Sequence, residues 1–179
     1  MSVSERKFGE LSTGEEISIY RLENKSGAYA EVSMFGAILV KLCVPDREGK
    51  LTDVVLGYDD VEQYEENGCF FGATIGRSGN RIAGAKFSIL GKDVILPKNE
   101  NENNLHSGPN GFEKKIWSVL ALSQEKNSVT FTRVSPDGEN GFPGEFRVSV
   151  KYEFTEENEL RIVYSGICDE DTVALSLIH

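Results

Sequence analysis

The stretch 147–165, RVSVKYEFTEENELRIVYS, decides the fold class, because apolar and polar residues alternate along it. In 147–154 every second residue is apolar, which is the pattern of a strand with one buried face. The alternation resumes at Leu160 after the polar turn 156–158. We therefore predict a β-hairpin over 147–165.

Similar short apolar runs recur along the chain, with turn residues between them. They predict further strands at 17–22, 28–34, 37–44, 54–56, 87–90, 94–96, 117–122, 129–134 and 172–178. The only helical segment that we expect is a short one within 58–66. Many short strands at roughly even spacing are typical of an antiparallel sandwich or barrel, so the predicted class is all-β.

The composition excludes several classes of partner. The chain has 19 Lys plus Arg against 29 Asp plus Glu, a net charge of −10, which argues against a nucleic-acid partner. No apolar stretch approaches the ~18 residues of a membrane span. Cys43, Cys69 and Cys168 lie far apart, which indicates neither a disulfide framework nor a zinc cluster and favours a cytoplasmic protein. With two histidines in the chain, no three-histidine metal site is expected.

The segment 71–82, FGATIGRSGNRI, holds the densest group of candidate binding residues. It is neither a P-loop nor a dinucleotide-binding fingerprint. It places two arginines and an asparagine among glycines that let the backbone approach a ligand closely. These side chains suit a polyhydroxylated or anionic small molecule, while the competing interpretation is a solvated turn.

His106 is the second candidate, in the polar segment 98–111, KNENENNLHSGPNG. Long loops inside compact domains are usually functional. A histidine there can act as a general acid, a general base or a hydrogen-bond donor, although an exposed loop histidine is most often only solvated. The acidic run 169–171 lacks the spacing of a calcium loop and is interpreted as a solvated turn.

Taken together, these segments resemble the aldose 1-epimerases, also called galactose mutarotases. The matching pieces occur in the family's order: FGA at 35–37, DVVLGY at 53–58, FGATIGR at 71–77, NRI at 80–82, NNLHSG at 103–108 and DGENGFPG at 137–144. The likeness runs from about Gly27 to the end of the chain. Ser78 and Ser107 depart from the family pattern, standing where valine and glycine are usual.

The resemblance implies a β-sandwich of the galactose-mutarotase (supersandwich) type. It also implies an isomerase that interconverts the α and β anomers of a free aldose, such as galactose or glucose, without a metal or a cofactor. Asn80, Arg81 and His106 then correspond to residues that bind sugar hydroxyls. His179 falls where the family carries the histidine that protonates the ring oxygen, which makes it the expected general acid.

The family's general base is a glutamate near the C-terminus of a protein almost twice this long. The resemblance therefore implies that 1–179 is the N-terminal part of one sandwich domain whose C-terminal half is absent, and we expect the chain alone to be inactive. The apolar run at its end fits this expectation. Two alternatives stay open: a non-catalytic carbohydrate-binding or sugar-sensing protein with the same fold, and a pseudoenzyme fragment without a ligand.

Overall fold

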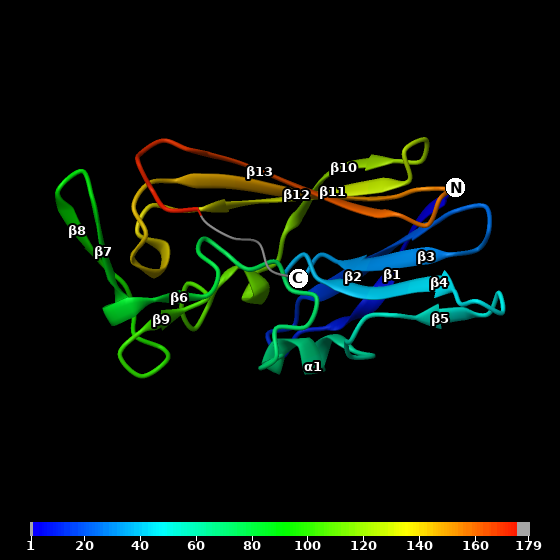
Figure 1. The fold of residues 1–179 in the computed structure, drawn as a ribbon, viewed down its shortest axis with the longest axis horizontal. Helices are drawn as coiled ribbons and strands as arrows, with labels where there is room; N and C mark the ends of the chain where they lie inside the picture. The colour runs from blue at the N-terminus through cyan, green and yellow to red at the C-terminus, as the bar shows by residue number, and fades with distance from the viewer. Residues whose placement is uncertain (1, 175–179) are drawn as a thin grey trace.

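Two antiparallel β-sheets make up most of the molecule, and the computed structural model describes residues 2–174 (Figure 1). The first sheet contains, in spatial order, β1 (Ser2–Glu10), β2 (Glu16–Glu23), β3 (Tyr29–Ser33), β4 (Leu39–Pro45) and β5 (Leu51–Asp53). The second contains β10 (Ser118–Ser123), β11 (Ser128–Ser135), β12 (Phe146–Phe154) and β13 (Leu160–Cys168). The predicted antiparallel β-sandwich is confirmed.

The hairpin that decided the fold class is formed by β12 and β13. In its register Val150 lies opposite Tyr164 and Tyr152 lies opposite Ile162. Along β12 the apolar residues are buried and the residues between them are more exposed, as the alternation predicts. Because a slip of one residue would turn this apolar face to solvent, the pattern also fixes the register.

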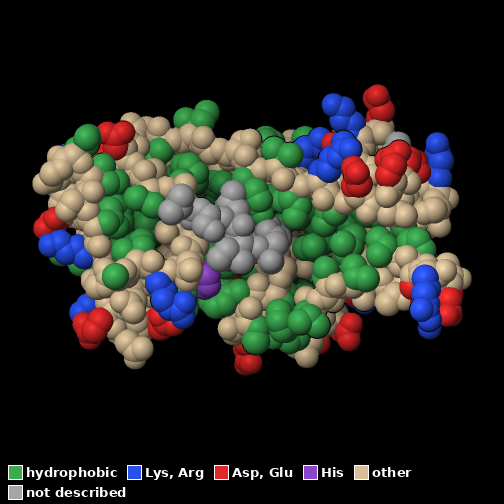
Figure 2. All heavy atoms as spheres, viewed as in Figure 1, with side chains coloured by type: hydrophobic (Ala, Val, Ile, Leu, Met, Phe, Trp, Pro, Cys, Tyr) green, Lys and Arg blue, Asp and Glu red, His purple; other side chains and the backbone are tan. Residues whose placement is uncertain are grey.

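The main core lies between the two sheets. Its largest fully buried side chains include Trp117, Phe131, Tyr152 and Phe154 from the second half of the chain, and they pack against Leu22 and Val32 of the first sheet. The hydroxyl of Tyr152 donates to the Ala37 carbonyl at 2.6 Å, which links the second sheet to the first. Figure 2 shows hydrophobic side chains at the surface in the middle of the visible face.

A second apolar cluster covers the other face of the first sheet. There α1 (Val61–Glu66) buries Val61 and Tyr64, as expected for the helical segment within 58–66. Asp60 caps its N-terminus by accepting from the Gln63 N–H at 3.0 Å. The Lys114 ammonium group donates to the last carbonyls of the helix and so caps its C-terminus. With six residues, α1 is far too short to span a bilayer, and no other helix in 2–174 is long enough to do so.

The strand prediction at 54–56 is wrong, the one at 172–178 fails over its described part, and β1 was not predicted. The strand expected at 54–56 lies instead at β5, because the Asp53 carboxylate accepts from the Leu42 and Val55 N–H groups and ends the ladder. Residues 172–174 form no strand, and the rest of the run expected at 172–178 lies outside the described residues. β1 has one buried residue, Val3, so it carries no alternation that sequence analysis could detect.

Two small ladders stand beside the sandwich. β7 (Lys86–Ile89) and β8 (Lys92–Ile95) form a hairpin, and β6 (Arg81–Ile82) pairs with β9 (Asn104–Leu105). Short 3₁₀ turns lie at Ala83–Ala85, Phe112–Lys114 and Glu139–Gly141. The polar segment 98–111 is therefore not structureless, since β9 lies within it and ties it to the segment 71–82.

Candidate functional site

Asn80, Arg81 and His106 lie together although the segments that carry them are separated in the sequence. In the antiparallel pair of β6 and β9, Arg81 lies opposite Leu105, and His106 follows directly. The His106 N–H donates to the Asn80 carbonyl at 3.0 Å and extends this pairing. The structure therefore brings together the three residues that were predicted to bind sugar hydroxyls.

The His106 imidazole is oriented by a backbone donor. The Asn80 N–H donates to Nδ1 at 2.9 Å. Because an accepting nitrogen carries no proton, the neutral ring has its proton on Nε2. Burial of the ring lowers the pKa of His106 below its ordinary value, the positive charge of Arg81 lowers it further, and Glu100 acts in the opposite direction. At neutral pH His106 is thus an uncharged ring that offers an N–H donor at Nε2.

Arg81 is held by Glu100, a residue that the sequence analysis did not identify. Nε and Nη2 of Arg81 donate to the two carboxylate oxygens of Glu100 at 2.6 and 2.5 Å. The hydrogen bonds from Arg81 lower the pKa of Glu100, which therefore stays ionised. Nη1 of Arg81 donates to Asn80 Oδ1 at 3.2 Å. Two carboxylates, Glu100 and Glu102, occur in 98–111, and only the pairing of β6 with β9 reveals which of them meets Arg81.

An open pocket of about 440 Å³ lies against His106. Its wall is mainly apolar and includes Leu39, Leu56, Phe70, Phe71 and Ile75. The Phe70 ring meets the imidazole edge-on, with 4.8 Å between the centroids. Of the three predicted sugar-binding residues, His106 lines the pocket, while Asn80 and Arg81 do not line it and lie at the start of the β6–β9 ladder. An apolar wall with a directed polar group is typical of a small-molecule site.

Three residues at this site have left-handed backbone conformations. The φ angles are 58° at Asn80, 57° at Phe70 and 52° at His106. Asparagine and histidine are enriched in this region, whereas the bulky Phe70 is strained there. The Asn67 side chain holds the turn at Phe70 by bonding both the N–H and the carbonyl of Phe71, at 3.0 and 3.2 Å. Strain of this kind is concentrated at functional sites.

Arg77 does not line the pocket beside His106; it lines a separate pocket of about 270 Å³ with Gly76 and Phe146. Its side chain is buried and donates to carbonyl oxygens and hydroxyls of other loops. Of the two arginines in 71–82, only Arg81 reaches the group formed with His106. Sequence alone could not separate them, because both stand beside glycine or asparagine in the same segment.

The glycines of 71–82 approach protein atoms rather than an open ligand site. A Cβ added at Gly72 would lie 2.0 Å from the Leu39 carbonyl oxygen, and one added at Gly76 would lie 2.2 Å from the Phe112 ring. The close approach expected from these glycines exists, but it packs the segment onto the sandwich.

Replacing Gly76 with alanine is therefore expected to destabilise the protein by about 2 kcal/mol, because the added methyl group overpacks against the buried Phe112 ring. Urea unfolding would measure the change. Gly68→Ala is the matched control, since no atom lies within 4 Å of the added methyl group. Equal stability of the two variants would contradict the packing account.

Ser78 and Ser107, the two departures from the family pattern, bond to each other. The Ser107 hydroxyl accepts from the Ser78 N–H at 2.7 Å and donates to the Ser78 carbonyl at 2.9 Å. Both residues are buried. This pair fastens the loop that follows His106 to the segment that carries Asn80.

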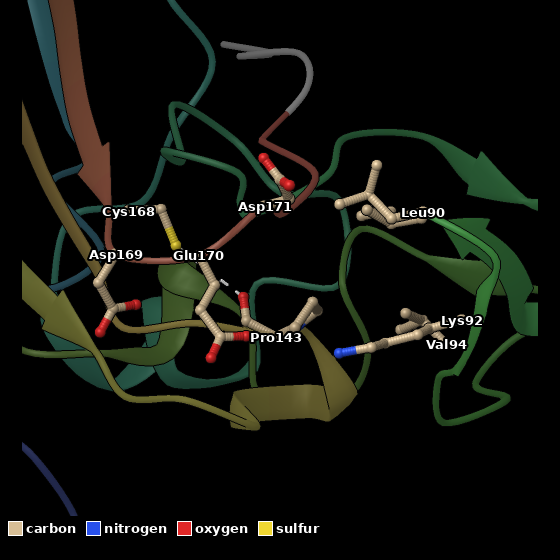
Figure 3. A pocket seen from close by; sticks show the side chains of 9 residues that line it. Leu90, Lys92, Val94, Pro143, Cys168, Asp169, Glu170 and Asp171 are labelled. Carbon is tan, nitrogen blue, oxygen red and sulfur yellow. Dashed lines mark hydrogen bonds between the residues drawn. The ribbon is translucent and has the colours of Figure 1, made fainter.

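A second pocket, of about 520 Å³, lies between the β7–β8 hairpin and the acidic turn 169–171. Figure 3 shows Leu90, Lys92 and Val94 on one side of it and Glu170 with its neighbours on the other. None of the residues predicted to bind sugar lines it.

In 2–174 no group of three or more His, Cys, Asp or Glu side chains is placed to hold a metal ion. His179, the expected general acid, lies outside the described residues.

Comparison with known proteins identifies relatives over nearly the whole chain. A family model for aldose 1-epimerase matches residues 18–179. Galactose mutarotase from Rattus norvegicus is 40% identical over 173 residues, which cover 96% of this chain and 49% of the relative.

Solved structures agree with these matches. An aldose epimerase homologue from C. elegans matches with a TM-score of 0.79 at 34% identity, over 84% of this chain and 46% of its own. Galactose 1-epimerase from Lactobacillus acidophilus NCFM matches with a TM-score of 0.84 at 25% identity, over 96% of this chain and 50% of its own. The chain thus spans about half the length of the curated relatives it matches.

Proposed function

The chain belongs to the aldose 1-epimerase family, and we propose that it provides part of the sugar site of an isomerase that interconverts the α and β anomers of aldohexoses such as galactose and glucose. The observation that carries the proposal is the group formed by Asn80, Arg81 and His106. In it a neutral imidazole presents an N–H donor beside an arginine and an amide. Such donors suit the hydroxyl oxygens of an uncharged sugar.

Ring opening of an aldose needs two proton transfers at different atoms. The anomeric hydroxyl loses a proton while the ring oxygen gains one, and one imidazole cannot reach both atoms at once. Glu100 is a poor base, because both its oxygens accept from Arg81 and its pKa is lowered. We propose that the described residues bind and orient the sugar, with His179 as the acid, and that the chain alone epimerises slowly or not at all.

The proposal invokes proton transfers only, so no cofactor or metal enters it. That residues 1–179 are the N-terminal part of a single larger sandwich domain stays a prediction. So do the cytoplasmic setting and the lack of nucleic-acid and membrane partners. A non-catalytic sugar-binding role with the same residues is the alternative, and a protein that also contains the family's C-terminal half would have to catalyse mutarotation for the enzyme to be favoured over it.

The variant His106→Asn tests the site, because the shorter side chain can still accept from the Asn80 N–H in place of Nδ1 but has no donor at the position of Nε2. We expect the wild-type chain to bind D-galactose and His106→Asn to bind it at least tenfold more weakly, with unchanged thermal unfolding. Titration followed by NMR measures the affinity. His106→Gln, which can keep a donor near Nε2, should retain more affinity than His106→Asn.

Polarimetry on α-D-galactose measures the reaction itself. The 179-residue chain is expected to change the rate of mutarotation little, since the described residues supply binding groups. A wild-type chain that binds neither galactose nor glucose would overturn the proposal. Strong catalysis that survives His106→Asn would overturn the role given to His106.

A further inference from the structure

Glu100 and Arg81 form a two-point contact, and the backbone at each of the two residues is held by hydrogen bonds. Arg81 is the first residue of β6. Glu100 lies in a turn closed by reciprocal backbone hydrogen bonds with Asn103, at 2.9 and 3.2 Å, and this turn leads into β9. Because β6 and β9 pair with each other, their backbones hold the Glu100 carboxylate and the Arg81 guanidinium close together.

This contact determines which donors Arg81 has left for a ligand. A guanidinium has five N–H groups, and Arg81 uses one each from Nε, Nη1 and Nη2 on Glu100 and Asn80. Two N–H groups remain. Since Asn80 Oδ1 accepts from Nη1, the NH₂ group of Asn80 is turned to the other side and is also left as a donor. Glu100 thereby orients Arg81 directly and Asn80 through it.

The contact also determines the charge of the site. An arginine without a carboxylate partner attracts carboxylates and phosphates, whose oxygens match its fork. In this protein Glu100 already occupies the Nε–Nη2 side of that fork, at 2.6 and 2.5 Å. The pair is neutral as a whole, and His106 beside it is neutral as well.

We propose that Glu100 is a specificity-determining residue: by clamping Arg81 it makes the site bind uncharged aldoses and disfavour sugars that carry a carboxylate or a phosphate. The inference rests on the proposed function and deepens it, because it assigns the charge class of the substrate to Glu100, whose two oxygens both accept from Arg81. Glu100 is in this sense a positioning residue that acts through Arg81.

The test compares D-galactose with D-galacturonate, which differs from it by a carboxylate at C6. Affinities for both are measured by NMR titration of the 179-residue chain. Wild-type protein is expected to prefer galactose. In Glu100→Gln the ratio of the two affinities should shift toward galacturonate by about tenfold, as expected for one uncompensated charge near the surface. Glu100→Asp, which keeps the charge, should restore most of the wild-type preference.

Glu102→Gln is the matched control, because Glu102 lies in the same segment but pairs with Lys98. Its ratio should equal that of the wild type. A purely structural effect of Glu100→Gln would weaken both ligands equally and leave the ratio unchanged, which would overturn the inference while wild-type galactose binding still supported the proposed function. If the wild-type chain bound neither sugar, the proposed function itself would fail, and this inference with it.

Discussion

Replacing Arg77 with methionine is expected to destabilise the fold by about 4 kcal/mol. Arg77 is 3% exposed, and its guanidinium makes six hydrogen bonds: one from Nε, two from Nη1 and three from Nη2. Four of the acceptors are backbone carbonyls, and each loses its charged donor in the variant. Leaving a buried polar group unpaired costs about 1–3 kcal/mol, and hydrogen bonds to charged groups exceed neutral ones.

The acceptors of Arg77 explain why one residue matters so much. They belong to Ser135, Pro136, Pro143 and Gly144, which flank the turn between β11 and β12, and to Thr172 after β13. One side chain therefore ties the segment 71–82 to the end of the second sheet. Burial lowers the pKa of Arg77, and the nearby carboxylates of Glu139 and Asp137 act in the opposite direction.

Urea unfolding of Arg77→Met, Arg77→Lys and Arg147→Met would measure this effect. Lysine keeps the charge but has three donors, so an intermediate loss is expected. Arg147 lies on β12 with its side chain 72% exposed and paired with Glu145, so its replacement should cost no more than about 0.5 kcal/mol. A stability of Arg77→Met within 1 kcal/mol of the wild type would contradict the structural role.

The difference between Arg77 and Arg81 shows where sequence reasoning succeeds and where it stops. Alternation along β12 predicted the hairpin, because burial of one strand face is a local property with a period of two. The partners of Arg77 are 58 to 95 residues away, so no local pattern encodes them. The contact of Glu100 with Arg81 depends on the two-residue ladder of β6 with β9, which is too short to leave a periodic signal.

Sequence reasoning selected three residues that the structure brings together, but it predicted neither their geometry nor the part of Glu100. Ordered motifs shared with a family pointed to Asn80, Arg81 and His106. They did not reveal that the Asn80 N–H bonds Nδ1 and so places the proton of His106 on Nε2. The error at 54–56 has a similar origin, because the Asp53 side chain competes with the ladder for backbone donors, and apolar residues next to it still resemble a strand.

Replacing Glu113 with glutamine is expected to make the protein more stable at alkaline pH and to leave its stability almost unchanged in acid. Glu113 is 2% exposed, and its Oε2 has no hydrogen-bond partner in 2–174. The side chain folds over Gly111, where an added Cβ would lie 2.4 Å from Oε2. Burial raises the pKa of Glu113 to about 7, although the backbone N–H groups and Lys114 and Lys115 favour the ionised form.

The direction of this pH effect on stability follows from proton binding to Glu113 in the folded and unfolded states. Between the unfolded pKa of about 4.5 and the folded pKa of about 7, the folded protein holds a proton on Glu113 that the unfolded chain has released. Rising pH therefore favours unfolding in this window, and the stabilisation that is fully present below about pH 4.5 is lost by the time the pH passes 7. A shift of about 2.5 pKa units corresponds to about 3 kcal/mol.

Urea unfolding at pH 5.5 and pH 8.5 separates this effect from the packing of the new amide. Glutamine does not titrate, so the difference in stability between Glu113→Gln and wild type should change in favour of the variant by about 2 kcal/mol over this interval. Every other titrating group is common to both proteins and cancels in the comparison. Glu62→Gln, on the exposed side of α1, should follow the wild-type pH dependence. Parallel pH curves for Glu113→Gln and wild type would mean that the buried carboxyl is ionised throughout, and the folded structure would then have to provide its Oε2 with a partner.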